Sequence, residues 1–176
     1  MSGRTDDLTI RDARPEDRAA VEAVTLAAYE QYAAVLAPPL WAAYRENILA
    51  TLAEASAVAT IVAEAATGVV GSVLLYPAGA ELAAPGSGRS ARLAHPEVRL
   101  LAVGPPGRGR GVGRRLMEEC IQRSRGAGAA ALTLHTTDMM AVAMRLYERM
   151  GFARAPELDF RPVPTMLVKG YRLPLT

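Results

Sequence analysis

The amino-acid sequence predicts a mixed α/β fold. Short β-rich runs and stretches of helical periodicity follow one another in the order β-α-α-β-β-β-α-β-α-β-β. The chain has 176 residues, of which 51% are hydrophobic and 22% are charged, as in ordinary globular proteins. A chain of this length can bury a sizeable core. We therefore expect a single domain over residues 1–176 and exclude disorder as the main state.

Prolines, acidic residues and glycines mark the ends of the expected helices. Arg14-Pro15-Glu16-Asp17 begins the first helix, because a first turn favours proline and carboxylates. Pro38-Pro39 ends that helix and begins the second. Gly126-Ala127-Gly128 ends the third, and Gly151 ends the fourth in a left-handed conformation. The four helices are expected over about residues 14–34, 40–53, 111–125 and 139–150.

Runs rich in β-branched residues mark the strands. Ala66-Thr67-Gly68 separates two such runs and predicts a hairpin. Residues 77–95 are rich in Gly, Ala, Pro and Ser and predict a loop, whose length indicates a functional or mobile segment. Pro162 and Pro164 lie between the last two runs. The expected strands are residues 8–13, 58–65, 69–76, 97–103, 130–135 and two more between 152 and 176.

The helix expected over residues 111–125 is amphipathic. At 100° per residue, apolar side chains occupy one half of its circumference and charged side chains the other half. Cys120 falls in the apolar half, which favours a small buried side chain over a reactive thiol. The apolar half comprises Val112, Leu116, Met117, Cys120 and Ile121.

Composition and charge exclude several function classes. With one cysteine, Cys120, no intrachain disulfide forms, and with His95 and His135 as the two histidines we expect no metal site. The net charge of +2 is too small to indicate nucleic acid. Residues 1–7 are polar and show no secretory signal, and no apolar stretch reaches the roughly 18 residues of a membrane span. We expect a cytoplasmic protein without nucleic-acid or membrane partners, and leave a homodimer open.

A glycine-rich loop, Arg108-Gly109-Arg110-Gly111-Val112-Gly113, stands between a strand and the amphipathic helix. Glycines let an anion approach the backbone N–H groups, and the helix N-terminus adds free donors and a positive dipole end. The two arginines add charge, so the loop predicts diphosphate binding. A tight turn with solvent-exposed arginines is the alternative. A Walker loop is excluded, because no Lys-Ser/Thr follows, and the glycine spacing does not fit a dinucleotide fingerprint.

Two motifs carry a resemblance to a known family. The loop matches the pattern Arg/Gln-x-x-Gly-x-Gly/Ala, and residues 146–152 match Leu-Tyr-x-x-x-Gly-Phe. Over about Glu97 to Phe152, a third of the chain, the arrangement resembles the GNAT superfamily of N-acetyltransferases. The resemblance implies a central mixed twisted sheet of six to seven strands, splayed at strands four and five and flanked by about four helices. The matching positions are Arg108, Gly111, Gly113, Leu146, Tyr147, Gly151 and Phe152.

The resemblance implies an acetyl-CoA-dependent enzyme that transfers acetyl directly from the CoA thioester to a primary amine of a small molecule or peptide. The loop would hold the diphosphate, and a strand backbone would align the pantetheine arm. Members often carry Asn where this chain has Met140, which leaves the contact with the arm in doubt. A non-catalytic acyl-CoA-binding or regulatory module on the same fold is the alternative. The implied cofactor-binding residues are Leu101, Ala102, Val103, Arg108, Gly109, Arg110, Gly111, Val112, Gly113 and Tyr147.

Tyr147 and Glu97 are the candidate catalytic residues that the resemblance implies. The Tyr147 hydroxyl would donate a proton to the departing thiolate, and packing on an amphipathic helix is its alternative. Glu97 would act as the base for the amine, commonly through water, or would instead pair with an arginine such as Arg99. By their ordinary pKa, His95 and His135 are further candidates for the base.

Two groups of side chains are candidates for the acceptor site. The resemblance places that site at the first two helices, the loop before strand four and the C-terminal strands. Four aromatic residues on the first two helices would line a pocket for an apolar or cationic substrate, or pack in the core. A strand expected at Pro156–Phe160 places Glu157 and Asp159 on one face, where they attract a cationic amine or face water. The aromatic residues are Tyr29, Tyr32, Trp41 and Tyr44.

Overall fold

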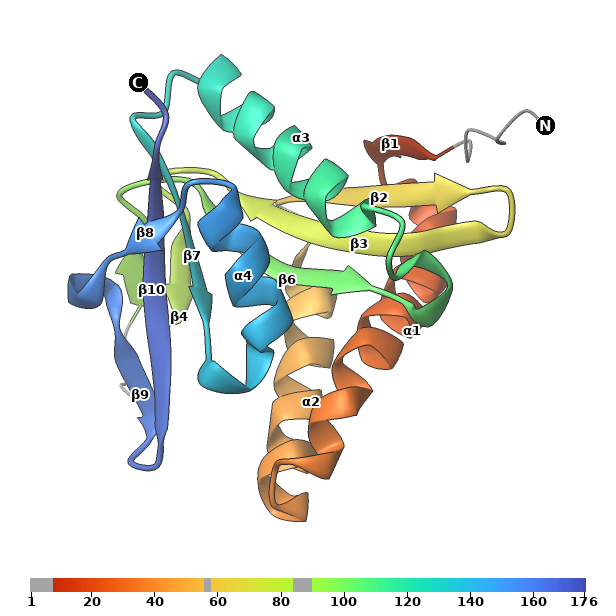
Figure 1. Cartoon of the computed structure of the whole chain (residues 1–176), viewed down its shortest axis with the longest axis horizontal. Coiled ribbons are helices and arrows are strands. Elements are labelled where there is room, and N and C mark those ends of the chain that lie inside the picture. Colours follow the sequence, from red (N-terminus) through yellow and green to blue (C-terminus); the bar gives the residue numbers. More distant parts are fainter. Residues whose placement is uncertain (1–7, 56–57, 84–89) are drawn as a thin grey trace. The chain divides into compact units, whose positions relative to one another are not determined.

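The computed structural model describes residues 8–55, 58–83 and 90–176 (Figure 1). The polar N-terminal residues 1–7 and residues 84–89 of the expected long loop lie outside the described residues, as do residues 56–57. The described part contains the four expected helices. They are α1 (Arg18–Tyr29), α2 (Pro38–Glu54), α3 (Val112–Gly126) and α4 (Ala141–Arg149).

The strands of the described part form one mixed sheet and one short hairpin. The hairpin consists of β4 (Glu81–Ala83) and β5 (Ser90–Arg92), paired antiparallel. The strands of the mixed sheet are β1 (Thr9–Asp12), β2 (Ala59–Ala65), β3 (Gly68–Tyr76), β6 (Glu97–Val103), β7 (Ala131–Thr136), β8 (Ala153–Arg154), β9 (Phe160–Val163) and β10 (Met166–Pro174). Parallel and antiparallel pairs both occur in it, so the predicted mixed α/β class is confirmed.

The chain folds into two compact units. The first, unit 1, comprises the described residues within Met1–Leu74 and Leu100–Glu119. Unit 2 comprises those within Leu75–Arg99 and Cys120–Thr176. Unit 1 therefore holds β1, β2, most of β3 and the end of β6, and unit 2 holds the start of β6 with β7, β10, β8 and β9. The expectation of a single domain over residues 1–176 stays a prediction.

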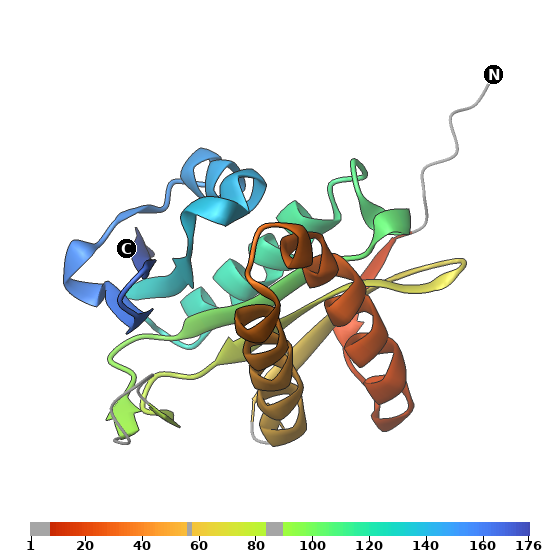
Figure 2. The ribbon, with the colours of Figure 1, turned by 90° about the horizontal axis from the view of Figure 1, so that it is seen from below.

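Helices cover both faces of the sheet in unit 1. The hydroxyls of Thr25 on α1 and Ser72 on β3 are buried and lie 3.2 Å apart. A Cβ on the preceding residue, Gly71, would lie 2.7 Å from Cγ1 of Val112 on α3. Neighbouring residues of a strand face opposite sides of a sheet. Hence α1 packs on one face of β3 and the start of α3 packs on the other, while α2 lies beside α1 (Figure 2).

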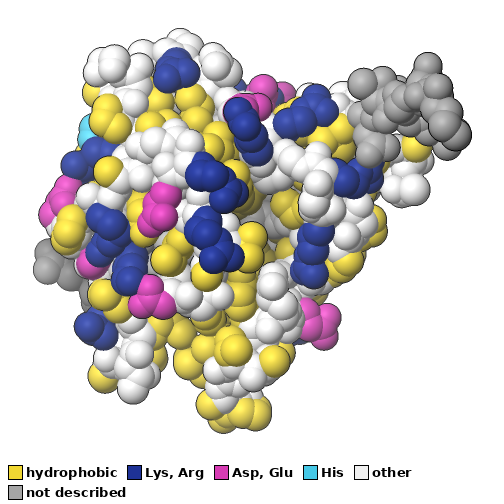
Figure 3. Space-filling model, in the orientation of Figure 1, with side chains coloured by type: hydrophobic (Ala, Val, Ile, Leu, Met, Phe, Trp, Pro, Cys, Tyr) yellow, Lys and Arg dark blue, Asp and Glu magenta, His cyan; other side chains and the backbone are white. Residues whose placement is uncertain are grey.

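The amphipathic pattern of α3 is confirmed. Its five apolar-half side chains are buried, and Cys120 is fully so, as expected for a small apolar residue. On the other half, Nε of Arg114 lies 2.8 Å from Oε1 of Glu118 in an exposed ion pair one helical turn apart. Basic and acidic side chains are interspersed on the face of the molecule that Figure 3 shows. No helix in the described ranges is long and apolar enough to cross a membrane.

In unit 2, β7 lies between a parallel and an antiparallel neighbour. It pairs with β10 in an antiparallel ladder from Ala131↔Pro174 to Thr136↔Lys169. Its parallel ladder with β6 registers Glu97 with Thr133 and Val98 with Leu134. That ladder is short compared with the seven residues of β6. It lies between the fourth and fifth of the predicted strands, where the splay was expected.

Four sequence-based expectations about local structure were wrong. Between residues 152 and 176 the chain forms three strands, β8, β9 and β10, where two were expected. Residues 77–95 contain the β4–β5 hairpin, in which Glu81 is opposite Arg92, and are not loop throughout. The first helix does not run from 14 to 34, because α1 is flanked by 3-10 turns at Pro15–Asp17 and Glu30–Ala34. The expected strand at 156–160 begins as a 3-10 turn, Pro156–Leu158, since Pro156 has no N–H for a ladder and its fixed φ suits a first turn.

Candidate acetyl-CoA and acceptor site

The glycine loop in unit 1 exposes backbone donors at the start of α3. Gly109 and Gly111 both have φ of 73°, in the left-handed region that favours glycine. The N–H of Arg115 donates to the Gly111 carbonyl at 3.1 Å and begins the helical ladder, so the first N–H groups of α3 have no acceptor within the helix. A Cβ on Gly109 or Gly111 would meet nothing within 4 Å, which leaves this backbone open to a ligand.

Two arginines complete the donor set of the loop. Arg108 is exposed and Arg110 is half-buried. Open N–H groups, a helix N-terminus and two guanidinium groups together are the donors that bind a diphosphate in other proteins. The residues present therefore fit the anionic part of acetyl-CoA.

The end of β6 provides the backbone that was predicted to align the pantetheine arm. Ala102 is buried, and Leu101 and Val103 are half-buried. The Tyr29 hydroxyl donates to the Leu101 carbonyl at 3.4 Å, a contact across 72 residues of sequence. Leu100 has φ of 49°, a left-handed conformation that is unusual for leucine. Sequence reasoning singled out neither Leu100 nor this use of Tyr29.

The four aromatic residues of the first two helices form one cluster in unit 1. The centroid distances are 5.9 Å for Tyr29–Tyr32, 6.0 Å for Tyr29–Tyr44 and 6.2 Å for Trp41–Tyr44. Tyr29 is buried, whereas the other three rings are half-buried. Core packing thus accounts for Tyr29 but not fully for its three neighbours.

Electrostatics links this cluster to the glycine loop. Burial raises the pKa of the Tyr32 phenol, and the positive charge of Arg108 acts on it in the opposite direction. Burial, followed by the influence of Tyr32, raises the pKa of the Tyr44 phenol. Both phenols are therefore neutral at physiological pH, and the charged group that acts on Tyr32 is a cation.

Glu97, at the start of β6 in unit 2, is a buried ion-pair partner. Glu97 is 3% exposed. Its Oε1 accepts a hydrogen bond from Nε of Arg99 at 2.7 Å and lies 3.6 Å from Nδ1 of His135. Burial raises the pKa of Glu97, but the hydrogen bond with His135 and the charge of Arg99 outweigh it and hold that pKa below its ordinary value. Arg99 also lies over the Tyr76 ring at 5.4 Å. The pairing with Arg99 that the sequence left open is present, and the base role of Glu97 stays a prediction.

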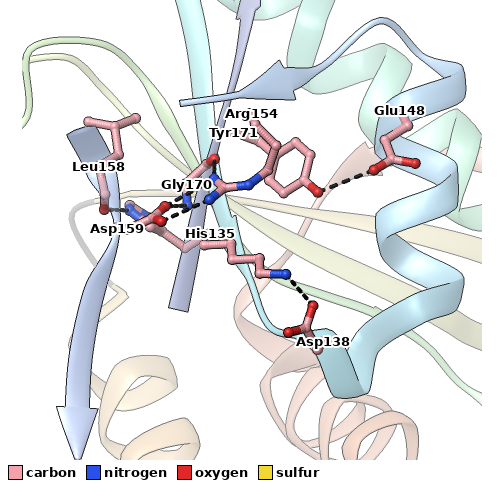
Figure 4. A network of polar contacts seen from close by, with 9 residues as sticks. His135, Asp138, Glu148, Arg154, Leu158, Asp159, Gly170 and Tyr171 are labelled. Atoms are coloured by element: carbon pink, nitrogen blue, oxygen red, sulfur yellow. Dashed lines mark hydrogen bonds and ion pairs between the residues drawn. The ribbon is translucent and has the colours of Figure 1, made fainter. Parts of the chain in front are cut away.

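His135 on β7 makes a second contact with its other ring nitrogen. Its Nε2 lies 2.9 Å from the carbonyl of Leu158, which can only accept, so Nε2 is the donor of this contact (Figure 4). The Phe160 ring packs edge-on against the imidazole at 5.2 Å. Both ring nitrogens are thus occupied by protein groups, which restricts His135 as a free base. His95 is half-buried before β6, and its candidate base role stays a prediction.

The two acids expected on one strand face are each engaged by an arginine. Arg154 binds Asp159 with two N–H groups, at 3.0 and 2.8 Å, and Asp159 also accepts the Gly170 N–H at 2.8 Å (Figure 4). Glu157 lies 2.8 Å from Nη1 of Arg172. These ion pairs in unit 2 fix the segment before β9 and reduce the negative charge that would attract a cationic amine.

Tyr147 lies on α4 and is buried, with 6% exposure. Its ring contacts Phe152 at 6.0 Å, and the N–H of Phe152 donates to the Tyr147 carbonyl at 3.0 Å. Gly151, with φ of 93°, ends the helix as expected. The signature Leu-Tyr-x-x-x-Gly-Phe is thus a helix terminus that packs the tyrosine against the phenylalanine.

The turn that joins β7 to α4 contains buried hydroxyl groups. The Oγ1 atoms of Thr136 and Thr137 are buried and have no hydrogen-bond partner within the described residues. Met140, which stands where family members often carry Asn, is half-buried and donates its N–H to the Thr137 carbonyl at 2.9 Å. Asp138 begins the 3-10 turn Asp138–Met140 before α4 and pairs with Lys169 of β10 (Figure 4). Among the described residues, no side chain caps this turn or α4 by a hydrogen bond.

The predicted site residues fall into both units. Leu101–Val103 and the loop at 108–113 belong to unit 1, together with the aromatic cluster. Glu97 and Tyr147 belong to unit 2. That these two sets act on one bound cofactor stays a prediction. Within the described ranges, no group of three or more His, Cys, Asp or Glu side chains is placed to hold a metal ion.

The glycine loop and the helix terminus at Gly151 contain the two motifs of the resemblance, and a family model covers both. Residues 21–152 match the model of the Acetyltransferase (GNAT) family. The chain belongs to this family, as the resemblance implied.

Two curated relatives match parts of the chain. An IAA acetyltransferase of Azospirillum brasilense is 40% identical over 72 residues, which are 40% of this chain and 47% of that protein. A streptothricin acetyltransferase of Streptomyces lavendulae is 43% identical over 53 residues, 30% of this chain and 28% of that protein. The chain therefore matches less than half the length of each of these relatives.

Solved structures share the fold over almost the whole chain. A GNAT-family acetyltransferase of Brucella melitensis in complex with acetyl-CoA has a TM-score of 0.64 at 24% identity, covering 97% of this chain and 90% of its own. A GNAT-family acetyltransferase of Staphylococcus aureus has a TM-score of 0.70 at 14% identity, covering 96% and 99%. The predicted GNAT fold is thereby confirmed.

Proposed function

We propose that this chain is an acetyl-CoA-dependent N-acetyltransferase that transfers acetyl directly to a primary amine of a small molecule or peptide. The observation that carries the proposal is the glycine loop, in which open N–H groups, two left-handed glycines and two arginines meet at the start of α3. Membership of the acetyltransferase family supports it. So does the acetyl-CoA bound to the Brucella melitensis protein of the same fold.

Each proposed role belongs to a group of this chain. Acetyl-CoA would supply an acyl group activated as a thioester. The N–H groups of the loop at residues 108–113 would hold its diphosphate, except that those of Arg108 and Arg110 already donate to the Pro105 and Gly107 carbonyls. The backbone of Leu101–Val103 would align its arm. The Tyr147 hydroxyl would give a proton to the departing sulfur, so that CoA leaves as a free thiol when the carbon–sulfur bond breaks and the new carbon–nitrogen bond forms.

The amine must lose its proton before it can attack, because an amine with a pKa of about 10 is less than about 0.1% neutral at pH 7. Glu97 is the proposed acceptor of that proton, directly or through water. Its pairing with Arg99 and its lowered pKa make it a weaker base than an unpaired carboxylate. A positioning role for Glu97, in which solvent takes the proton, is the alternative.

A matched pair of glycine variants tests the cofactor proposal. Gly111 and Gly128 have φ of 73° and 72°, and a Cβ on either would meet nothing within 4 Å. Alanine should therefore strain both backbones equally, by about 1–2 kcal/mol. Gly111→Ala should weaken acetyl-CoA binding at least tenfold in calorimetry, because its methyl lies in the loop that faces the diphosphate. Gly128→Ala should bind normally, and equal effects of the two variants would refute the loop as the cradle.

Transfer itself is tested by free CoA released in the presence of a panel of primary amines. In the wild-type protein, acetyl-CoA at 100 times its Kd should also stabilise the fold by about 2.7 kcal/mol. Binding without CoA release from any amine would favour the second candidate, a non-catalytic acyl-CoA-binding module. The engagement of Glu97 by Arg99 is the observation that favours this second candidate.

A further inference from the structure

We infer that the aromatic cluster of Tyr29, Tyr32, Trp41 and Tyr44 binds the acceptor, and that this acceptor is a primary amine with an aromatic body and no second positive charge. The inference rests on the proposed function and names its substrate class. Two observations within unit 1 carry it, the position of the cluster and its partial exposure, and the charge beside the cluster supports it.

The position of the cluster follows from Tyr29. The Tyr29 hydroxyl donates to the Leu101 carbonyl, in the strand end that would align the acetyl-bearing arm. The Tyr29 ring contacts both Tyr32 and Tyr44. A ligand that stacks on this cluster is therefore held beside Leu101, where the acyl group is proposed to lie.

The partial exposure of the cluster provides surface for a ligand. Tyr32, Trp41 and Tyr44 are half-buried, so each residue keeps part of its surface in contact with solvent. The neighbouring Val35, which ends the 3-10 turn between α1 and α2, is 66% exposed. Exposed rings that already meet at tilted and edge-on angles accept a further aromatic ring in the same geometry.

The charge beside the cluster selects against polycations. The charged group that acts on Tyr32 is the Arg108 guanidinium, and the phenols of Tyr32 and Tyr44 stay neutral. The faces of tyrosine and tryptophan attract one cation, but a nearby guanidinium opposes any additional positive charge. An arylalkylamine satisfies this environment, because its one nitrogen is neutral when it reacts and the rest of the molecule is apolar. A polyamine such as spermidine keeps further ammonium groups and does not.

Trp41 reports directly on this site, because it is the single tryptophan of the 176 residues. Phenethylamine added to the wild-type protein with CoA present should change the fluorescence excited at 295 nm in a saturable manner. Spermidine at the same concentrations should leave the fluorescence unchanged. A saturable response to spermidine, or none to phenethylamine, would overturn the inference.

A variant series separates recognition from folding. Tyr44→Leu removes the half-buried ring that joins Trp41 to Tyr29, and should lower kcat/KM for phenethylamine at least tenfold while changing that for ethylamine less than threefold. Val142→Ala, at a side chain 75% exposed on α4, is the control and should change neither. Equal losses for both amines in Tyr44→Leu would show that the cluster is only core and would overturn the inference.

The inference and the proposed function fail in different ways. If the chain binds acetyl-CoA and acetylates spermidine or ethylamine better than phenethylamine, the proposed function stands and the aromatic acceptor is wrong. If acetyl-CoA does not bind and no amine releases CoA, the proposed function is wrong and the acceptor inference is overturned with it.

Discussion

Arg99 donates to the carboxylate of Glu97 at 2.7 Å, and the two side chains differ sharply in exposure, at 31% and 4%. A buried charge that loses its partner is costly, whereas an exposed one can turn to water. Arg99→Gln should therefore lower the free energy of unfolding, but by less than the roughly 3–5 kcal/mol of a wholly unpaired buried charge, because His135 stays beside Glu97. Glu97→Gln should lower it less than Arg99→Gln. Urea unfolding of both variants at pH 7 measures the difference. Equal losses, or a larger loss in Glu97→Gln, would show that the pair is not organised around the buried carboxylate.

The pH dependence of turnover distinguishes the two roles of Glu97. If Glu97 were the base, the ratio of wild-type to Glu97→Gln kcat would fall from pH 6 to pH 10, because the amine loses its proton unaided at high pH. A positioning role, in which Glu97 takes no proton from the amine, instead predicts a ratio that stays constant over this range. Steady-state rates at five pH values provide the comparison. A ratio that declines with pH would restore the base role.

Tyr147→Phe keeps the aromatic ring and its contact with Phe152, and removes only the hydroxyl. If that hydroxyl protonates the departing thiol sulfur, kcat should fall by about 10²-fold. The affinity for acetyl-CoA should change by less than about 1 kcal/mol, near the net contribution of one hydrogen bond. Stopped assays and calorimetry measure the two quantities. Unchanged kcat with weaker binding would reassign Tyr147 to cofactor binding.

Two buried threonines of β7 differ in one hydrogen bond. Oγ1 of Thr133 donates to the Pro96 carbonyl at 3.1 Å, whereas Oγ1 of Thr136 has no partner within the described part of the chain. Valine has nearly the same shape without the hydroxyl. Thr136→Val should therefore raise the free energy of unfolding by about 1 kcal/mol, and Thr133→Val should lower it by a similar amount. Loss of stability in both variants would mean that the Thr136 hydroxyl also makes a hydrogen bond.

Acid should weaken unit 1 through Asp17. Hydrogen bonds from Arg11, at 2.6 and 3.1 Å, and from the Arg14 N–H lower the pKa of Asp17 to about 2. Because the pKa is lower in the folded protein than in the unfolded chain, this stabilisation is present above pH 4 and is lost as the pH falls toward 2. Asp17→Asn should therefore lose less stability than the wild type between pH 4 and pH 2. Glu16→Gln, at the exposed neighbouring residue, should follow the wild type.

Local patterns predicted the elements of this fold well. The elements from β1 to β3 and from β6 to α4, the amphipathic face of α3 and the terminus at Gly151 each depend on a few neighbouring residues, and the structure confirms them. The β4–β5 hairpin was not predicted, because its strands have three residues each and lie among Gly, Ala, Pro and Ser. So short a pattern does not outweigh the turn-forming composition around it.

Contacts between distant residues could not be predicted from the sequence. Asp138 stands just before the expected fourth helix, where a carboxylate is a common cap, but it pairs with Lys169, 31 residues away. The bond from Tyr29 to Leu101 depends on how α1 packs beside the end of β6. The pairing of Glu97 with Arg99 could be foreseen as an alternative, since residues two apart on a strand face the same side. The partnership of Glu97 with His135 depends on the parallel register of β6 and β7.

Gly71 and Gly111 illustrate two unrelated reasons for keeping a glycine. A Cβ on Gly71 would lie 2.7 Å from Val112 and 3.0 Å from the Ala102 carbonyl, so this residue sets how closely α3 approaches β3. A Cβ on Gly111 would meet open space. In a saturation-mutagenesis experiment, substitutions at Gly71 would deplete the cellular abundance of the protein, whereas substitutions at Gly111 would deplete catalysis with far less effect on abundance. Two positions that look equally invariant in such a selection would thus be constrained for different reasons. Gly71 is constrained by the packing of α3 on β3, and Gly111 by the access of a ligand to the backbone.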